Sequence, residues 1–508
     1  MTIMVDIIAK ALATLIALGG VLAVGACGGG GPTPAASPTA AVTREVPAAR
    51  EPLTTDSQSP VAHDTEIDAL TAHSGRLFAA TDQWEYPGPS GYGQVLVKDS
   101  ADSPWRVFEQ TQSIRVQAID SFAIPADQGL GPGHSLLITQ AIVNGRSELQ
   151  WLLDGASSFS PADSFTLASG ADVRSFGAHE SGGVWSVYAG VNPTGIQRGT
   201  WSVTRHTLMF SPAPELTAAP PGSPGLKTQK VTAFTECGGA LYVTINTRLY
   251  RRNDGALPSG AARWVLVYAE PPVGAFNSGL RGLTCVTHAG APALLLSTEG
   301  TGNIYRLDHL PHGLLAGTAP PGPGRTAAGL ALTLEFAPIP AIRQMLAADG
   351  VRVPASGPGS VGYVIAAYNN ITTIDTALGA QQVFGFEWGY RGSCPAARTC
   401  GPVAFGSYAY DAAACFAVRT DDEPTPGYAL RCLAGPDFTP AGPGSLGQGS
   451  PIQAGQAFVS IRSITLSPFG DGRIYFSGYD CNFYPADGTA WIASSPLSAA
   501  ALTDQKGQ

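Results

Sequence analysis

The sequence predicts an all-β fold built from repeated four-stranded units, and three observations predict it. Short runs rich in Val, Ile, Leu, Tyr and Phe alternate with turn residues, which is typical of strands joined by tight turns. The chain contains 62 Gly and 41 Pro, and few stretches have a helical pattern. The runs also recur in a set order, with a mean period of about 57 residues, which indicates a repeat architecture.

The first element in chain order indicates export. Lys10 precedes the apolar run Ala11–Ala26, which is shorter than the roughly 20 residues of a membrane-spanning helix. The stretch Val24-Gly25-Ala26-Cys27 resembles a bacterial lipobox. The resemblance to bacterial lipoproteins implies a signal peptide over 1–26, acylation of Cys27, and an exported protein of the bacterial cell envelope that lipid anchors to the outer membrane or cell surface. An uncleaved helical anchor and an ordinary signal peptide are the alternatives.

The second element is a tether over residues 27–64. It starts with four glycines after Cys27 and continues in Ala, Pro, Ser and Thr without a periodic apolar pattern. The globular domain is therefore expected over 65–508. Its partners do not include nucleic acid, because charged residues make up only 13% of the chain and the net charge is −9. The oligomeric state is left open.

The repeat is clearest in the stretch from Val231 to Tyr268. Four strands are expected there, over Val231–Phe234, Ala240–Val243, Leu249–Arg252 and Trp264–Tyr268. Counterparts of the second of these strands begin at Arg76, Ser135, Val184, Ala293, Tyr363, Cys415 and Arg473.

This repeat resembles a β-propeller, and the resemblance implies a single propeller of seven or eight four-stranded blades over 65–508. The stretch from Leu249 to Gly255, which leads to Trp264, is loosely similar to the strand-turn of Asp-box and kelch-type propellers, although its spacing departs from the Asp-box pattern. The resemblance concerns architecture and carries no activity. A β-sandwich and a parallel β-helix are the alternative folds.

Seven cysteines follow Cys27, and in an exported chain they indicate disulfides with one cysteine left over. Cys394 and Cys400 enclose a short loop. Cys415 and Cys432 flank a predicted hairpin, where they would lie opposite each other. The pairing of the other three is left open; they are Cys237, Cys285 and Cys481.

Neither a metal site nor a cofactor is predicted. No cysteine pair has the Cys-x-x-Cys spacing of a zinc or redox site. His73, His179 and His288 each precede the second strand of a repeat, and equivalent positions in different blades lie too far apart for one metal ion. We expect these histidines to cap hairpins.

The ligand site is expected on one face of the ring. In propellers, the loops between the second and third strands and the loops between blades share the face around the channel mouth. Aromatic, acidic and cationic side chains gather on the corresponding segments, and they suit either sugar rings or a protein partner. The predicted ligand-binding residues are Trp84, Tyr86, Glu387, Trp388, Tyr390, Arg391, Tyr479 and Asp480.

The sequence favours a noncatalytic propeller that is anchored at the surface and binds a glycan or a protein. It contains no Gly-x-Ser-x-Gly elbow, no His-Glu-x-x-His helix and no Walker loop. The alternative is a carbohydrate-active enzyme of the glycoside hydrolase or lyase type with paired carboxylates, for example Glu387 and Asp480, since such pairs need no motif. Two carboxyls about 5 to 9 Å apart at the channel mouth, one with a raised pKa, would favour that enzyme. A structural assembly component is the third class.

Overall fold

The computed structural model describes residues 43–45, 49–50, 66–82, 93–217, 230–259, 261–271, 279–315, 321–376, 379–396, 400–405, 408–411, 414–420, 426–433, 460–479 and 490–497. All of them belong to one compact unit, Ala40–Gln508. Within these ranges no helix is both long enough and apolar enough to cross a membrane. The predicted signal peptide over 1–26 and Cys27 lie outside the described residues.

Three sheets are made of consecutive antiparallel strands. A 4-stranded sheet has the order β10-β9-β8-β7, and two 5-stranded sheets contain β11 to β15 and β16 to β19 with β23. Their strands are β7 (Ile119–Ala123), β8 (Ser135–Val143), β9 (Arg146–Leu153), β10 (Ser164–Thr166), β11 (Asp172–Ser181), β12 (Val184–Asn192), β13 (Gly195–Ser202), β14 (Thr207–Phe210), β15 (Leu216–Thr217), β16 (Val231–Cys237), β17 (Ala240–Ile245), β18 (Arg248–Arg252), β19 (Trp264–Ala269) and β23 (Arg325–Thr326). The four strands predicted between Val231 and Tyr268 are β16 to β19, as an antiparallel meander.

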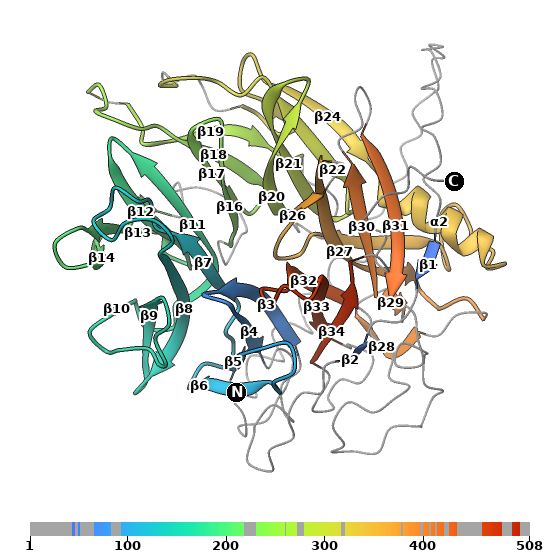
Figure 1. Cartoon of the computed structure of the whole chain (residues 1–508). Coiled ribbons are helices and arrows are strands. Elements are labelled where there is room, and N and C mark those ends of the chain that lie inside the picture. The colour runs from blue at the N-terminus through green and yellow to red at the C-terminus, as the bar shows by residue number, and fades with distance from the viewer. Residues whose placement is uncertain are drawn as a thin grey trace, which may run out of the picture. The chain divides into compact units, whose positions relative to one another are not determined.

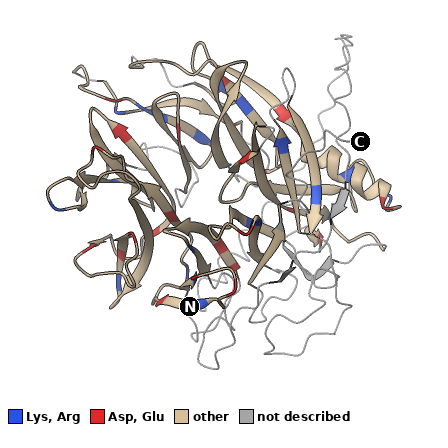
Figure 2. Cartoon of the chain, viewed as in Figure 1, with Lys and Arg blue, Asp and Glu red and all other residues tan. Residues whose placement is uncertain are grey.

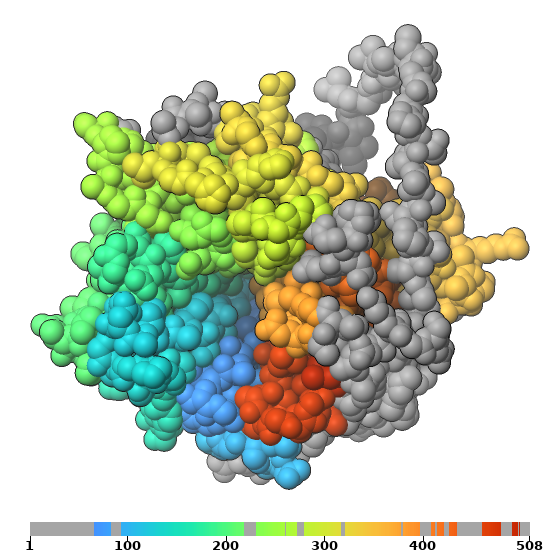
Figure 3. Space-filling model, turned by 45° about the horizontal axis from the view of Figure 1, so that its top comes forward, coloured from blue at the N-terminus to red at the C-terminus, as the bar shows by residue number. Residues whose placement is uncertain are grey.

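An 8-stranded sheet joins the beginning and the end of the described chain. It consists of β2 (Ala49–Arg50), β3 (Glu66–His73), β4 (Arg76–Asp82), β5 (Gln94–Lys98), β6 (Arg106–Gln110), β32 (Ser460–Leu466), β33 (Arg473–Tyr479) and β34 (Trp491–Pro496). β3 pairs with β33 where Glu66 faces Tyr479. In Figure 3 the blue surface of the early strands accordingly lies beside the red surface of the late ones.

The largest sheet has 12 strands and curves as a half-barrel in Figure 1. It contains β1 (Thr43–Glu45), β20 (Leu280–His288), β21 (Ala291–Gly300), β22 (Ile304–Asp308), β24 (Ala331–Phe336), β25 (Val361–Ala366), β26 (Thr372–Thr376), β27 (Gly379–Arg391), β28 (Cys400–Phe405), β29 (Tyr408–Asp411), β30 (Cys415–Thr420) and β31 (Gly427–Leu433). The helix α2 (Pro338–Ala348) buries Ile342, Met345 and Leu346 against its core. β1 and β2 lie in the segment predicted as a tether; β1 pairs with β31 and β2 with β34.

The predicted count of seven or eight separate four-stranded blades is wrong. The described strands form five sheets in a propeller-like arrangement around one axis, with β3, β7, β16, β20 and β32 near the centre of Figure 1. The count fails because sheets merge: β21 pairs with β25 at Glu299 and Gly300, and β3 pairs with β33. The 13-residue β27 also pairs with both β25 and β30, so the repeats assigned to Tyr363 and Cys415 share one sheet.

Disulfides link both near and distant strands. Cys415 and Cys432 face each other in the β30–β31 pair and are bonded, as the predicted hairpin requires. Cys237 is bonded to Cys285, which connects β16 with β20 in another sheet. Cys394 is also in a disulfide. The side chain of Cys400, its predicted partner, lies outside the described residues.

Candidate functional site

A cavity of about 240 Å³ lies on the propeller axis. Its wall comes from the innermost strands of all five sheets, which explains why residues far apart in the sequence meet there. The lining includes Leu70, Gln117, Arg174, Phe234, Leu283, Asn370 and Ser463. The wall is more polar than apolar, and it includes the charged residues Asp120 and Arg174.

Five innermost strands share an irregularity beside this cavity. Each strand breaks its register with the neighbouring strand at the same level: β3 after Ile67, β11 after Val173, β16 after Val231, β20 after Leu280 and β32 after Ile461. A β-bulge re-aims a side chain and is common next to active sites. The residues that directly follow these positions are all polar, namely Asp68, Arg174, Thr232, Arg281 and Arg462.

Three buried carboxyl groups meet at this level of the axis. Glu66 and Asp68 come from β3, and Asp82 ends the adjacent strand β4. One carboxylate oxygen from each lies within 4.8 Å of those of the other two. Asn369, which lines the cavity, donates a hydrogen bond to the backbone carbonyl of Asp68. The cluster therefore lies behind Asn369, although none of its three residues lines the cavity itself.

Guanidinium groups neutralise part of the cluster. Arg115 Nε lies 3.0 Å from Asp82 Oδ2. Arg462 forms an ion pair with Glu66, and its Nη1 lies 3.1 Å from Glu387 Oε2, which is close enough for an ion pair although not aligned for a hydrogen bond. Figure 2 shows acidic residues in red and basic residues in blue on β3 and β32, which lie side by side.

The remaining charge of the cluster favours protonated carboxyls. Burial, with added repulsion from Asp82 and Glu387, raises the pKa of Glu66 to about 7, although Arg462 opposes this shift. Burial, Glu66 and Asp82 raise the pKa of Asp68 well above its usual range. Asp68 Oδ2 accepts no hydrogen bond when the neighbouring carboxyls are ionised. A proton shared between Asp68 and Asp82 would supply the missing hydrogen bond. Carboxyls with shifted pKa values are suited to acid–base chemistry near neutral pH.

Three carboxylates are also the oxygen ligands that Ca²⁺ prefers, but Arg115 and Arg462 already pair with two of them.

The Tyr368 ring contacts two guanidinium groups at the axis, those of Arg462 and Arg281. The Arg462 guanidinium lies 3.5 Å from the Tyr368 ring centroid, and that of Arg281 lies 4.4 Å from it. Arg281 also forms an ion pair with Glu299, whose Oε1 accepts a hydrogen bond from the Tyr363 hydroxyl at 3.0 Å. These contacts fix the cations in place, since cation–π attraction and ion pairing act on the same groups.

The predicted ligand-binding residues are distributed differently from the expectation. Glu387 is buried, contacts Arg462 and accepts a hydrogen bond from Ser460 Oγ at 3.3 Å, so it belongs to the axial network. Trp388 and Tyr390 are fully buried in the core of the 12-stranded sheet, and the Tyr390 hydroxyl donates to Asp411 at 2.7 Å.

Core side chains cover the rings of both Trp388 and Tyr390, so neither ring is open to a ligand in this structure. Arg391 is exposed at the end of β27, with its guanidinium 5.8 Å from the Tyr408 ring centroid. Trp84, Tyr86 and Asp480 lie outside the described residues, as does the side chain of Tyr479. Their role stays a prediction.

The sequence reasoning missed the residues that carry the axial charge. Glu66 and Asp68 are separated by one residue inside an apolar strand, where alternating carboxyls look like a solvated strand face. Arg462 lies 396 residues from Glu66 in the chain. The one available signal was that acidic residues interrupt an otherwise apolar strand at the start of the domain.

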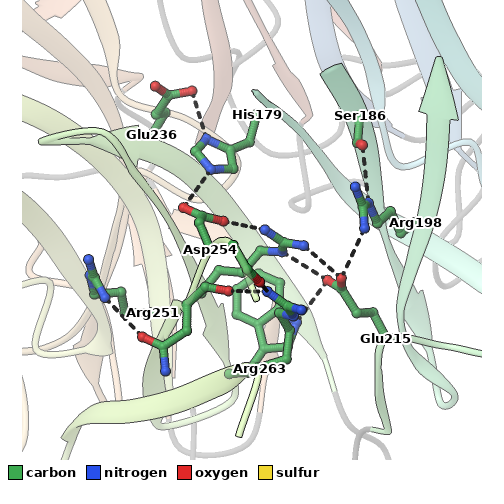
Figure 4. A network of polar contacts seen from close by, with 12 residues as sticks. His179, Ser186, Arg198, Glu215, Glu236, Arg251, Asp254 and Arg263 are labelled. Carbon is green, nitrogen blue, oxygen red and sulfur yellow. Dashed lines mark hydrogen bonds and ion pairs between the residues drawn. The ribbon is translucent and has the colours of Figure 1, made fainter. Parts of the chain in front are cut away.

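A second polar network, centred on the buried imidazole of His179, lies between two sheets (Figure 4). His179 on β11 stands between two acids, with Nδ1 3.1 Å from Glu236 Oε2 and Nε2 3.0 Å from Asp254 Oδ2. Hydrogen bonds to both acids outweigh burial and raise the pKa of His179 to about 9. Arg252 links Asp254 to Glu215, with Nη2 2.9 Å from Glu215 Oε1. The imidazolium therefore ties the β11 sheet to the β16 sheet.

No protein-family model and no curated protein matches the sequence. Solved structures with a similar fold include Sqt1 from Chaetomium thermophilum bound to the N-terminus of ribosomal protein L10, at 12% identity and a TM-score of 0.40 over 82% of this chain and 83% of that one. A sialidase from Trypanosoma rangeli has 10% identity and a TM-score of 0.34 over 74% and 59%. An exo-beta-1,3-galactanase from Clostridium thermocellum has 9% identity and a TM-score of 0.29 over 88% and 96%. Identities and TM-scores this low do not indicate a substrate for this chain.

The expectation of a noncatalytic glycan- or protein-binding propeller is corrected by the carboxyl groups on the propeller axis. The axis holds close carboxyl groups, one with its pKa raised to about 7, as the enzyme alternative requires. They are buried, and one oxygen from each lies within 4.8 Å of those of the other two, whereas the expected pair was about 5 to 9 Å apart at the channel mouth. The carboxyl cluster is the observation that favours the enzyme alternative.

Proposed function

We propose that the chain is a carbohydrate-active enzyme of the glycoside hydrolase or lyase type, with its acid–base groups on the propeller axis. The observation that carries the proposal is the cluster of Glu66, Asp68 and Asp82 beside the axial cavity. Hydrolysis of a glycosidic bond needs one carboxyl that donates a proton and a second that attacks the sugar or activates water. The cluster contains a carboxyl suited to each of these two roles.

The two roles are assigned by environment. Glu66, with a pKa of about 7, is protonated in about half of the molecules at neutral pH and is the general acid that protonates the glycosidic oxygen. Asp82 is the carboxylate, because Arg115 at 3.0 Å stabilises its charged form. Asp68 lies between them and adjusts the charge of the site.

The spacing favours a retaining mechanism. Retaining glycosidases place their carboxyls about 5 to 5.5 Å apart, whereas inverting enzymes need about 6.5 to 9.5 Å to admit a water molecule. One oxygen from each carboxyl lies within 4.8 Å of those of the other two, which is closer to the shorter spacing than to the longer one. In this mechanism the Asp82 carboxylate attacks the anomeric carbon while Glu66 protonates the leaving oxygen, and water then releases the sugar.

The test is a degradation assay on neutral and acidic polysaccharides, reading both new reducing ends and unsaturated products. Activity should fall as the pH rises through about 7, because Glu66 loses the proton it donates. Glu66→Gln and Asp82→Asn should each lower kcat at least about 100-fold. Glu109→Gln on the outer strand β6 is the matched control, since burial raises the pKa of that carboxyl too.

Two results would refute the proposal. One is a panel of plant, algal, bacterial and animal polysaccharides from which the purified protein releases no product. The other is product formation that Glu66→Gln and Asp82→Asn leave as fast as Glu109→Gln does, which would place the chemistry elsewhere.

A further inference from the structure

Two cations near the axis lack close counter-charges. Arg174 lines the cavity, its side chain is 11% exposed, and its one acidic partner is Asp172 at 3.9 Å. Lys230 directly precedes β16, and the Lys230 ammonium has no ion pair among the described residues. The Ser175 hydroxyl donates to the Val231 carbonyl at 3.0 Å, which holds the Arg174 and Lys230 segments side by side.

The other cations at this level of the axis are all close to carboxylates. Arg115 pairs with Asp82, Arg281 with Glu299, and Arg462 with Glu66. Acidic groups therefore lie on β3 and β4 and at Asp120, which lines the cavity with its pKa raised by burial to about 6, whereas Arg174 on the wall and Lys230 beside it are the cations with the fewest close counter-charges. Burial and the nearby Arg174 and Arg281 lower the pKa of Lys230 to about 8, as expected of an ammonium group among other cations.

A neutral polar group on the cavity wall is also without a partner. Gln117 is 4% exposed and lines the cavity, and its Oε1 accepts no hydrogen bond. A buried amide oxygen normally has a donor, so one is expected from a bound molecule. Sugar hydroxyls are donors of this kind.

We propose that the axial site takes a glycan that carries carboxylate groups, a chain of uronic acid residues, and that Arg174 and Lys230 bind the carboxylate. This inference rests on the proposed function and names its substrate class. The planar fork of an arginine matches a carboxylate with two parallel hydrogen bonds, and a lysine adds a point charge. Gln117 accepts from a ring hydroxyl, and the carboxyl cluster faces the bond that is cleaved.

A uronate also suits the charge of the site better than a doubly charged phosphate. Glu66, Asp68 and Asp82 lie near the same space, and each added negative charge would be repelled by them. A single carboxylate is enough to compensate Arg174 and Lys230. A neutral sugar would leave Arg174 and Lys230 uncompensated in a half-buried site.

The experiment measures binding by the full-length protein rather than turnover. The probes are hexamers of galacturonic, mannuronic and glucuronic acid, each compared by calorimetry with its methyl ester, which keeps the sugar rings and removes the charge. At least one acid should bind at least about tenfold more tightly than its ester, and added salt should reduce the difference. Arg174→Gln and Lys230→Met should each reduce that preference severalfold, while Arg205→Gln, on an exposed turn, should leave it unchanged.

Each failure has a separate meaning. Equal binding of acids and esters, no binding of any hexamer, or a preference that survives the Arg174→Gln, Lys230→Met double variant would overturn the inference. So would tighter binding of a sulfated, uronate-free galactan. Binding of an acid hexamer without cleavage would support the inference and contradict the proposed hydrolase or lyase. Cleavage of neutral glycans alone would support the proposed hydrolase or lyase and contradict the inference of a uronate substrate.

Discussion

Removal of the Arg462 guanidinium is expected to destabilise the protein strongly. The side chain of Arg462 is 3% exposed, it pairs with Glu66, and its Nη1 lies 3.1 Å from Glu387. Its guanidinium also lies over the Tyr368 ring. Arg462→Met keeps much of the side-chain volume but leaves the buried Glu66 and Glu387 carboxylates without this cation.

The magnitude follows from burial. Breaking a buried ion pair by removing one partner costs about 3 to 5 kcal/mol, because an uncompensated charge remains in a low-dielectric site. The exposed pair of Arg106 with Asp99 has a similar N···O distance of 2.8 Å, but its side chains are 50% and 42% exposed. Arg106→Met should therefore cost less than about 1 kcal/mol.

The assay is urea unfolding of both variants and of the double variant Arg462→Met, Glu66→Gln. Glu66→Gln removes one of the two orphaned charges, so the double variant should recover at least about 1 kcal/mol relative to Arg462→Met. The penalty of Arg462→Met should also shrink between about pH 8 and pH 5, because Glu66, whose pKa is already about 7, becomes neutral.

Two outcomes would refute this reasoning. If Arg462→Met costs no more than Arg106→Met, burial does not control the strength of the pair. If the penalty is the same at both pH values and Glu66→Gln recovers nothing, Arg462 stabilises the fold through packing and not through charge.

Three further predictions concern other parts of the chain. His179→Gln should lower the free energy of unfolding by about 2 to 3 kcal/mol below pH 6.5, where His179 is protonated in both the folded and the unfolded wild type. The difference should disappear as the pH rises through about 9, and a pH-independent difference in urea unfolding would contradict the assigned pKa. Loss of the Cys237–Cys285 disulfide, which closes a separation of 48 residues, should cost about 4 kcal/mol against about 3 kcal/mol for Cys415–Cys432, which closes 17; thermal unfolding of the paired Ser variants checks that order, and the opposite order would refute the loop-length account. Mass spectrometry should find an acylated N-terminus at Cys27, and an unprocessed Met1 form would count against the lipobox.

The local elements of the fold could be predicted because their signals are local. The runs around Val231, Ala240, Leu249 and Trp264 became strands β16 to β19, since apolar alternation and turn residues act within a few positions of each other. The bond between Cys415 and Cys432 followed from the same logic, because opposed positions in a hairpin are set by its turn.

The number of sheets could not be predicted in this way. It depends on whether strands far apart in the sequence share hydrogen bonds, as at Glu299 and Ile365 or at Glu66 and Tyr479. Such contacts leave no mark on local periodicity. For the same reason the aromatic residues Trp388 and Tyr390 looked like surface anchors, although the structure buries them in a core.

By itself the sequence determined the strands, the turns between them and one disulfide, because backbone preference and side-chain alternation act over a few residues. Only the tertiary structure decided the candidate site. Bulges in separate strands bring Asp68, Arg174 and Arg462 to one axis, and burial there shifts the pKa of Glu66 to about 7. Burial and charge proximity are properties of the packed chain, and no short motif encodes them.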